Sequence, residues 1–313
     1  MNGEALVQLA MATLACNQKT LASHLGVSPA QISKWKKGDH MSFDMSRRLR
    51  DISGIGDRVP GFVQRVGSLD EAKKWERLLA WLAELAEDAA ETGYDTPLSD
   101  EPDILSWDTL DVLEAMGVAI PQPFPPELEV DYDDDEVSEE VLQHELVSLI
   151  YAIYKSLTGV YGFYAAYVQD LVFDDELDLF AGEGGAIDFH LLALAASKVE
   201  AAERLAPGFK RFQYRIEKNY IQWLNVVKAK AVQAGKPLRA ELLNMVHGSH
   251  DELGHEAEAE SFGMNARRLH PDIYMDELLR GMRVIHQVLP AILKKLEIYD
   301  EFALDESELR AGG

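Results

Sequence analysis

Apolar residues recur every three to four positions along most of this chain, and stretches of alternating apolar and polar residues are rare. The first spacing places apolar side chains on one face of an α-helix, whereas alternation is typical of a strand. Glycine and proline residues separate the apolar runs and mark helix ends. The pattern therefore predicts an all-α protein. Beyond the amino-terminal part, the expected helices cover residues 68–92, 107–116, 139–172, 187–205, 209–234, 238–260 and 272–299.

The helix expected at 68–92 carries a regular apolar seam. Ser68 or Asp70 can cap its start, because both side chains accept hydrogen bonds from first-turn amides. Its apolar positions repeat in a three-four pattern: Trp75, Leu78, Leu82, Leu85 and Ala89. This pattern suits a contact between two copies of the chain, and it also suits a helix lying on its own core. The seam spans little more than two heptads, so the second interpretation is favoured.

Residues 93–140 are rich in proline and acidic side chains, and we expect a hinge or linker there, interrupted by the helix at 107–116. An acidic run lies near its end: Asp131, Asp133, Asp134, Asp135 and Glu136. Such a run is usually solvated chain, but it can also bind a protein partner or mimic DNA. The expected domains are a head at 1–67, an acidic helix and proline-rich linker at 68–138, and a helical dimerisation or sensing domain at 139–313.

Charge is distributed unevenly along the chain. The formal net charge is −24, which by itself argues against a nucleic-acid partner. Residues 1–67, however, hold nine lysines and arginines against five acidic residues, whereas residues 68–146 hold three against 24. A basic head followed by an acidic middle indicates contact with nucleic acid at one end of the chain only.

The opening segment and the cysteine content favour the cytoplasm. Residues 1–15 lack the basic start, apolar run and cleavage site of a secretory signal. Cys16 is the only cysteine, so it cannot form an internal disulfide and suits a reducing compartment. Residues 147–173 resemble a membrane span in apolar content, but Lys155 near their centre and five tyrosines favour a buried bundle helix. We therefore expect no membrane contact.

Residues 17–55 predict two short helices joined by a tight turn. The first helix has an apolar face formed by Leu21, Ala22 and Leu25, and Gly26 ends it. Ser28 caps the second helix, whose inner face carries Ile32 and Trp35. This arrangement is what a helix-turn-helix requires, because glycine lets the chain turn sharply. At this spacing we expect Trp35 in the core of the small domain.

This segment resembles the helix-turn-helix of the phage repressor and Cro family, also called the Xre family. The resemblance covers about a sixth of the chain and implies a five-helix-type DNA-binding domain. In that family the second helix of the pair enters the major groove by its amino-terminal end. The resemblance rests on eleven positions in the family's spacing: Gln18, Leu21, Ala22, Leu25, Gly26, Val27, Ser28, Ile32, Ser33, Trp35 and Gly38.

Carried over by position, the resemblance implies base contacts by Pro29, Ala30, Gln31 and Lys34. Gln31 can pair with adenine, Lys34 can donate to guanine, and Ala30 can touch a thymine methyl group. Pro29 departs from the family's pattern because it has no polar group, so discrimination falls to Gln31 and Lys34. Contacts to the DNA backbone are expected from Gln18, Lys19, Ser28, Ser33, Lys36 and Lys37. Arg47, Arg48 and Arg50 are either solvated or further phosphate contacts.

Three histidines near the carboxyl terminus have a composition that could hold a metal. His247, His250 and His255 occur with several carboxylates, but they share no clean helical face and differ from the H-E-x-x-H order. A solvated helix end is the favoured interpretation, and we expect no cofactor. No serine or cysteine nucleophile stands in a recognisable motif, so the sequence gives no support for catalysis.

Three functions remain open at this level. The leading hypothesis is a transcriptional regulator, most simply a repressor, that binds double-stranded DNA as a homodimer because one helix-turn-helix reads only a few base pairs. The second is an antitoxin or interaction protein that neutralises a partner and regulates its own operon. The third is a DNA-binding effector with an enzymatic carboxy-terminal domain.

Overall fold

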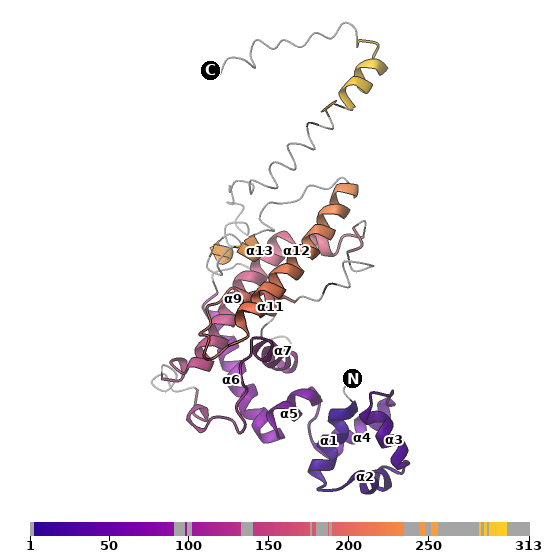
Figure 1. Ribbon diagram of the computed structural model, residues 1–313, viewed down its shortest axis with the longest axis vertical. Helices are drawn as coiled ribbons and strands as arrows, with labels where there is room; N and C mark the ends of the chain where they lie inside the picture. Colours follow the sequence, from indigo (N-terminus) through magenta and orange to yellow (C-terminus); the bar gives the residue numbers. More distant parts are fainter. Residues whose placement is uncertain are drawn as a thin grey trace.

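The computed structural model describes residues 3–90, 98, 102–132, 140–175, 177–179, 187, 190–234, 244–247, 252–255, 282, 285–286 and 288–298, which contain helices and no strand. The predicted all-α fold is therefore confirmed. The elements are α1 (Gly3–Thr13), α2 (Gln18–Leu25), α3 (Pro29–Lys36), α4 (Phe43–Ser53), α5 (Pro60–Val66), α6 (Leu69–Asp88), α7 (Pro102–Ala115), the 3-10 helix η1 (Pro126–Leu128), α9 (Glu145–Tyr167), α10 (Gln169–Val172), α11 (Leu191–Ser197), α12 (Phe209–Ala234) and α13 (Asn244–His247). Figure 1 shows α1–α4 grouped at one end, α5 beside them, and α6, α7, α9, α11 and α12 in a separate bundle.

Helices α1 to α5 form the head of the molecule. Helix α1 lies at its centre, because it packs against α2, α3, α4 and α5. Each of the five helices contributes to a common core, and the largest buried side chains include Leu6, Leu21, Ile32, Leu49 and Phe62. Burial of such side chains supplies the main favourable free energy of folding in a domain this small.

Helix α5 connects the head to the bundle. It packs against α1 on one side and against α6 and α7 on the other. Its Gln64 donates a hydrogen bond to the Gln8 side chain of α1 at 2.5 Å. The next residue, Arg65, forms ion pairs with Asp111 at 3.3 Å and Glu114 at 3.4 Å, both on α7. Neighbouring side chains of one short helix therefore bond to both halves of the protein.

The apolar seam of α6 lies inside the chain's own core. The helix begins after Ser68, whose hydroxyl accepts a hydrogen bond from the amide of Glu71. Trp75, Leu78 and Leu82 are fully buried, and α6 packs against α5, α7 and α9. The favoured interpretation of this seam therefore agrees with the structure. These three positions are therefore not open to a contact between copies of the chain.

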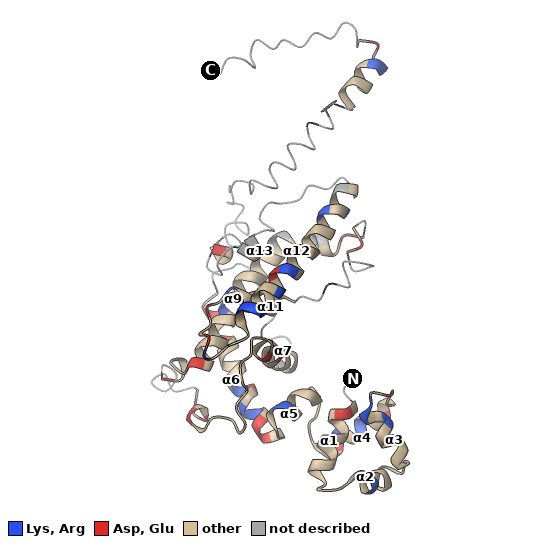
Figure 2. Cartoon of the chain, viewed as in Figure 1, with Lys and Arg blue, Asp and Glu red and all other residues tan. Residues whose placement is uncertain are grey.

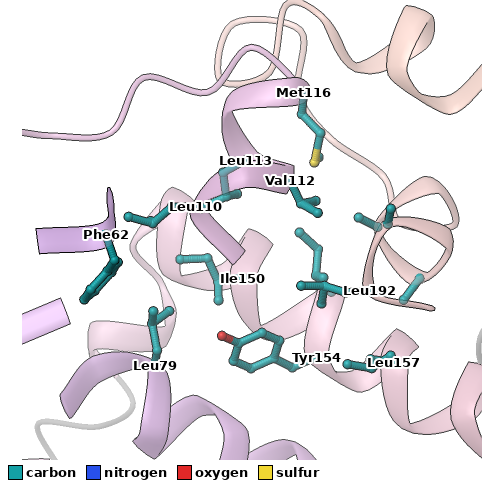
Figure 3. Close-up of a cluster of buried hydrophobic side chains, with 14 of the residues drawn as sticks. Phe62, Leu79, Leu110, Val112, Leu113, Met116, Ile150, Tyr154, Leu157 and Leu192 are labelled. Carbon is teal, nitrogen blue, oxygen red and sulfur yellow. The ribbon is translucent and has the colours of Figure 1, made fainter. Parts of the chain in front are cut away.

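Residues 102–132 pack against the bundle, although their proline content predicted a linker. Helix α7 begins at Pro102, earlier than expected, because proline is well suited to the first turn of a helix. Figure 3 shows Leu110 and Leu113 of α7, with Met116 directly after its end, among buried side chains of the neighbouring helices, and Phe62 of α5 at the edge of the same cluster.

The segment that follows α7 packs onto α6 through aromatic side chains. Phe124 meets Trp75 edge-on at 5.1 Å between ring centroids, and Tyr132 stacks on Trp81 at 5.0 Å. These contacts explain why the linker prediction differs from the structure: prolines interrupted the helical pattern, but the apolar residues between them still found partners. Four residues of the acidic run, 133–136, lie outside the described residues.

Helix α9 is the one described helix long and apolar enough to cross a membrane by length and composition. Its window, Glu145–Ala165, is 72% buried inside the protein. It packs against α6, α10 and α11, and Ile150, Ile153 and Tyr154 lie in the shared core. Neighbouring helices thus cover this apolar surface, as expected for a core helix of a bundle.

The remaining helices follow the sequence pattern with shifted ends. Helix α12 has the predicted bounds, and α11 is shorter than the predicted helix at 187–205. The predicted helix at 139–172 is divided at Val168 into α9 and α10. Of the predicted helices at 238–260 and 272–299, the structure describes helical pieces at 244–247, 252–255 and within 282–295.

Candidate DNA interface

Helices α2 and α3 form a two-helix unit joined by a turn at residues 26–28. Gly26 ends α2 with φ +72° and ψ +29°, and its amide donates to the carbonyl oxygens of Ala22 and Ser23. Glycine enters this left-handed region without the steric penalty that a Cβ atom incurs. Val27 also donates to the Ala22 carbonyl at 2.9 Å, which completes the turn.

Helix α3 starts from a serine cap and buries one face. The Ser28 hydroxyl accepts a hydrogen bond from the amide of Gln31 at 3.2 Å, and Pro29 occupies the first turn. Ile32 and Trp35 point into the head and are at most 4% exposed. Trp35 is therefore a core residue, as the sequence predicted.

The opposite face of α3 is open at its amino-terminal end. Pro29, Ala30 and Lys34 are exposed and Gln31 is half-buried. Ala30, Lys34 and Lys37 follow each other at intervals of four and three, so they share one helix face. The four residues expected at base edges, Pro29, Ala30, Gln31 and Lys34, therefore all lie at least partly at the surface of the unit.

The two helices are tied together by Gln18 at the start of α2. Its side-chain nitrogen donates to the Pro29 carbonyl at 2.7 Å and to the Ser33 hydroxyl at 2.5 Å. An amide nitrogen has two hydrogens to donate, so both are engaged. Gln18 therefore positions α3, and its side chain has no hydrogen left for a phosphate while these bonds stand. The Ser33 hydroxyl accepts one of them and keeps its own hydrogen for donation.

Backbone amides at the start of α2 point away from the helix body. The first bond within the helix runs from the Leu21 amide to the Asn17 carbonyl, and the Asn17 side chain accepts from the Thr20 amide. The amides of Gln18 and Lys19 precede these bonds, and such first-turn amides suit an anionic oxygen. Lys19 adds an exposed positive charge beside them.

The three arginines of α4 have different surroundings. Arg48 donates to the Leu25 carbonyl at 3.2 Å and so holds the end of α2. Arg50 donates to the carbonyls of Gly56 and Arg58, each at 2.8 Å, and fixes the loop before α5. Arg47 is exposed. The sequence suggests solvated side chains or phosphate contacts for these arginines. Arg48 and Arg50 donate to carbonyl groups of the protein backbone.

Positive charge gathers on the two-helix unit. Figure 2 marks lysine and arginine positions in blue on α2, α3 and α4, and neither α2 nor α3 contains an acidic residue. Lys34 and Lys37 are exposed and Lys36 is half-buried. This unit therefore presents a locally basic surface on a strongly acidic protein.

Phe43 is an exposed aromatic residue that the sequence pattern did not indicate. Phe43, the first residue of α4, is 76% exposed directly after the loop from α3. The sequence signal was ambiguous, because a phenylalanine in a helix with a marked apolar face is normally assigned to the core.

The histidine cluster carries no metal-site geometry in the described residues. His255 is exposed, His250 lies outside the described residues, and for His247 only the backbone of α13 is described. Within the part of the chain that the structure covers, no group of three or more histidine, cysteine or acidic side chains could hold a metal ion.

Comparisons of this chain with protein-family models, with curated proteins and with solved structures found no match.

Proposed function

We propose that this protein is a sequence-specific DNA-binding transcriptional regulator whose head reads the major groove with α3. The observation that carries the proposal is the exposed amino-terminal face of α3, with Gln31 and Lys34, held against α2 by the Gln18 side chain. A helix fixed in this way presents an amide and an ammonium group, which pair with adenine and guanine edges. The resemblance to the phage repressor and Cro family supports the same assignment.

Different residues of the head bind the bases and the phosphates. Base discrimination falls to Gln31 and Lys34, with Ala30 and Pro29 in apolar contact. Phosphate binding falls to the first-turn amides of α2, to the hydroxyls of Ser28 and Ser33, and to three lysines: Lys19, Lys36 and Lys37. Phosphate contacts set affinity and register, whereas base contacts set specificity. Repression follows where the occupied operator overlaps a promoter.

A second copy of the chain completes the operator-binding unit, because one helix-turn-helix reads only a few base pairs. Trp75, Leu78 and Leu82 of the α6 seam are fully buried, so these positions do not supply the contact between copies. The described part of residues 282–298 offers a better surface, since five exposed apolar residues repeat there in a three-four pattern: Met282, Ile285, Leu289, Ile292 and Leu296. This spacing is typical of the seam between two paired helices.

The proposal is tested by selection of preferred duplexes from a random library with the full-length protein. We expect a preferred sequence with two related half-sites centred about 34 Å apart. The variant Gln31→Ala with Lys34→Ala should lose this preference. The matched control is Lys218→Ala with Gln222→Ala, which removes the same two side-chain types from exposed positions on α12. Recovery of no preferred duplex by the unaltered protein would contradict the proposal.

A further inference from the structure

A cleft opens on the bundle between α7, α12 and the start of α11. Its volume is about 580 Å³, which lies within the range of sites that take small organic molecules. Its floor is apolar, because Val112, Ala193, Phe212 and Ile216 line it and are buried. A floor of this kind excludes water from the apolar part of a bound molecule.

The α7 wall of the cleft is acidic. Asp108, Asp111 and Glu114 line it, and Arg215 of α12 is the one arginine or lysine in the lining. His190 also lines the cleft, but its Nδ1 accepts a hydrogen bond from the Ala193 amide, which places the ring proton on Nε2 in the neutral form. With three carboxylates and one guanidinium group, the lining carries an excess of negative charge and favours a cation.

Asp108 is the carboxylate of this wall without a lysine or arginine partner among the residues described. It is half-buried, and burial raises the pKa of its carboxyl group above the usual value, while the nearby His190 lowers it by a smaller amount. In the described part of the chain it has no hydrogen-bond or ion-pair partner, whereas Asp111 and Glu114 both pair with Arg65. An ammonium group in the cleft would offset the unfavourable burial of this charge.

The same wall is linked to the head. Asp111 and Glu114 line the cleft, and they also hold Arg65 of α5 by ion pairs of 3.3 and 3.4 Å. Arg65 lies 4.2 Å above the Trp107 ring centre, and its side chain is only 19% exposed. Since α5 packs directly on α1, these two ion pairs connect the wall of the cleft to the head.

We propose that this cleft binds a small organic molecule with an ammonium group and an apolar body, and that Asp111 and Glu114 convey its presence to the head through Arg65. Asp108 receives the ammonium group, and the apolar body lies on the floor. Arg215 distinguishes two kinds of ligand, because a free carboxylate on the ligand, as in an amino acid, would pair with its guanidinium group. The regulatory half of this inference rests on the proposed DNA-binding function, and the binding half does not.

Binding is tested first, without DNA, by thermal unfolding and calorimetry of the full-length protein. The probes are butylamine, putrescine and leucine, with butan-1-ol as the uncharged control. We expect at least one ammonium compound, and not butan-1-ol, to raise the unfolding midpoint. Asp108→Asn should weaken that binding at least about tenfold, which corresponds to about 1.4 kcal/mol. Asp175→Asn, an exposed aspartate of the bundle outside the cleft, should leave it unchanged.

The binding of each probe to Arg215→Gln and Asp108→Asn identifies the class of ligand and tests the site. If Arg215→Gln weakens binding of leucine alone, the ligand class is amino acids, and if it weakens none, the class is simple amines. No binding by any ammonium probe, or equal binding by Asp108→Asn, overturns the proposed site. Asp108→Asn is expected to fold, because it removes a partly buried charge without removing a hydrogen bond that the structure describes.

The link to the head is tested with the duplex recovered by selection. The bound amine should change the affinity for this duplex at least about fivefold. Arg65→Gln should still bind the amine but lose this dependence, and Arg65→Lys should keep part of it because the positive charge remains. An affinity that ignores the amine in the unaltered protein overturns the link. If no duplex is preferred, the proposed function is contradicted. The ligand site is still supported in that case, provided that Asp108→Asn loses amine binding.

Discussion

The side chain of Gln18 donates to the Ser33 hydroxyl at 2.5 Å and thereby joins the first helix of the two-helix unit to the second. The same nitrogen reaches the Pro29 carbonyl at 2.7 Å. Both acceptors belong to α3, one in its first turn and one a turn later. Together with the packing of α3 on α1 and α2, this side chain fixes the distance and the rotation of the helix that presents Gln31 and Lys34.

Gln18→Ala should reduce both the DNA affinity and the stability of the protein. Each lost hydrogen bond is partly solvent-exposed and contributes about 0.5–1.5 kcal/mol to folding. We expect the free energy of unfolding to fall by about 1–2 kcal/mol and the affinity for the selected duplex to fall at least tenfold, by about 1.4 kcal/mol or more. Denaturant titration and fluorescence anisotropy measure the two effects. Unchanged affinity would show that Gln18 does not position α3.

The lysines that follow the base-reading positions should act on affinity without changing sequence preference. Lys36→Ala and Lys37→Ala each remove one positive charge that the proposed binding mode places near the phosphates. We expect each to weaken binding to all duplexes alike and to reduce the slope of log affinity against log salt by about 1. Lys218→Ala on α12 is the control and should leave the slope unchanged. A change of preferred sequence in either variant would place that lysine at the bases.

Gly26→Ala should destabilise the head because of backbone conformation alone. No atom lies within 4 Å of a Cβ added there, but its φ is +72°. A residue with a Cβ atom loses about 1–2 kcal/mol in this region. Gly254→Ala is the matched control, since a Cβ there also meets nothing within 4 Å and its φ is not positive. Denaturant unfolding should show a loss for Gly26→Ala only, and equal effects of the two substitutions would contradict this explanation.

These residues also show how far the sequence could predict the site. The glycine turn, the Ser28 cap and the burial of Trp35 were predictable, because each depends on neighbours within one or two helical turns. The bonds from Gln18 were not predictable, since they depend on the crossing of two helices. The cleft was harder still to predict, because Asp108 and Arg215 lie on separate helices and His190 precedes a third, and these elements meet only in the folded bundle.

The structure of the middle segment shows a second limit of sequence reasoning. Prolines between residues 97 and 126 indicated a linker, but proline only prevents continuation of a helix and does not prevent packing. Phe124 and Tyr132 still reach Trp75 and Trp81 of α6. The periodicity of α6 likewise could not specify whether its partner was the same chain or a second copy.

Lys198 should give the protein a distinctive dependence of stability on pH. Burial lowers the pKa of its ammonium group from 10.5 to about 8. Between these values the unfolded chain binds a proton that the folded chain has released, so the free energy of unfolding gains a contribution that rises with pH. Lys198→Met should remove this rise between pH 8 and 10.5, and the exposed Lys218→Met should not. Identical pH profiles for the two variants in denaturant titrations would contradict the assignment.

The exposed apolar positions near the carboxyl terminus should hold two copies together. Leu289→Asp with Ile292→Asp places charges in the three-four seam of residues 282–296. We expect this variant to be monomeric by light scattering and to bind a single half-site only. Leu289→Met with Ile292→Leu keeps the apolar surface and should remain dimeric. A dimer in the aspartate variant would place the contact elsewhere.

The most direct test of the account is the affinity of the full-length protein for its selected duplex, measured beside a duplex with both half-sites scrambled. We predict that Gln31→Ala with Lys34→Ala binds the two duplexes equally, with the circular dichroism spectrum and unfolding midpoint of the unaltered protein. Lys218→Ala with Gln222→Ala should keep the full preference. If the first variant still prefers the selected duplex as strongly as the unaltered protein, α3 does not read the bases and the central claim fails.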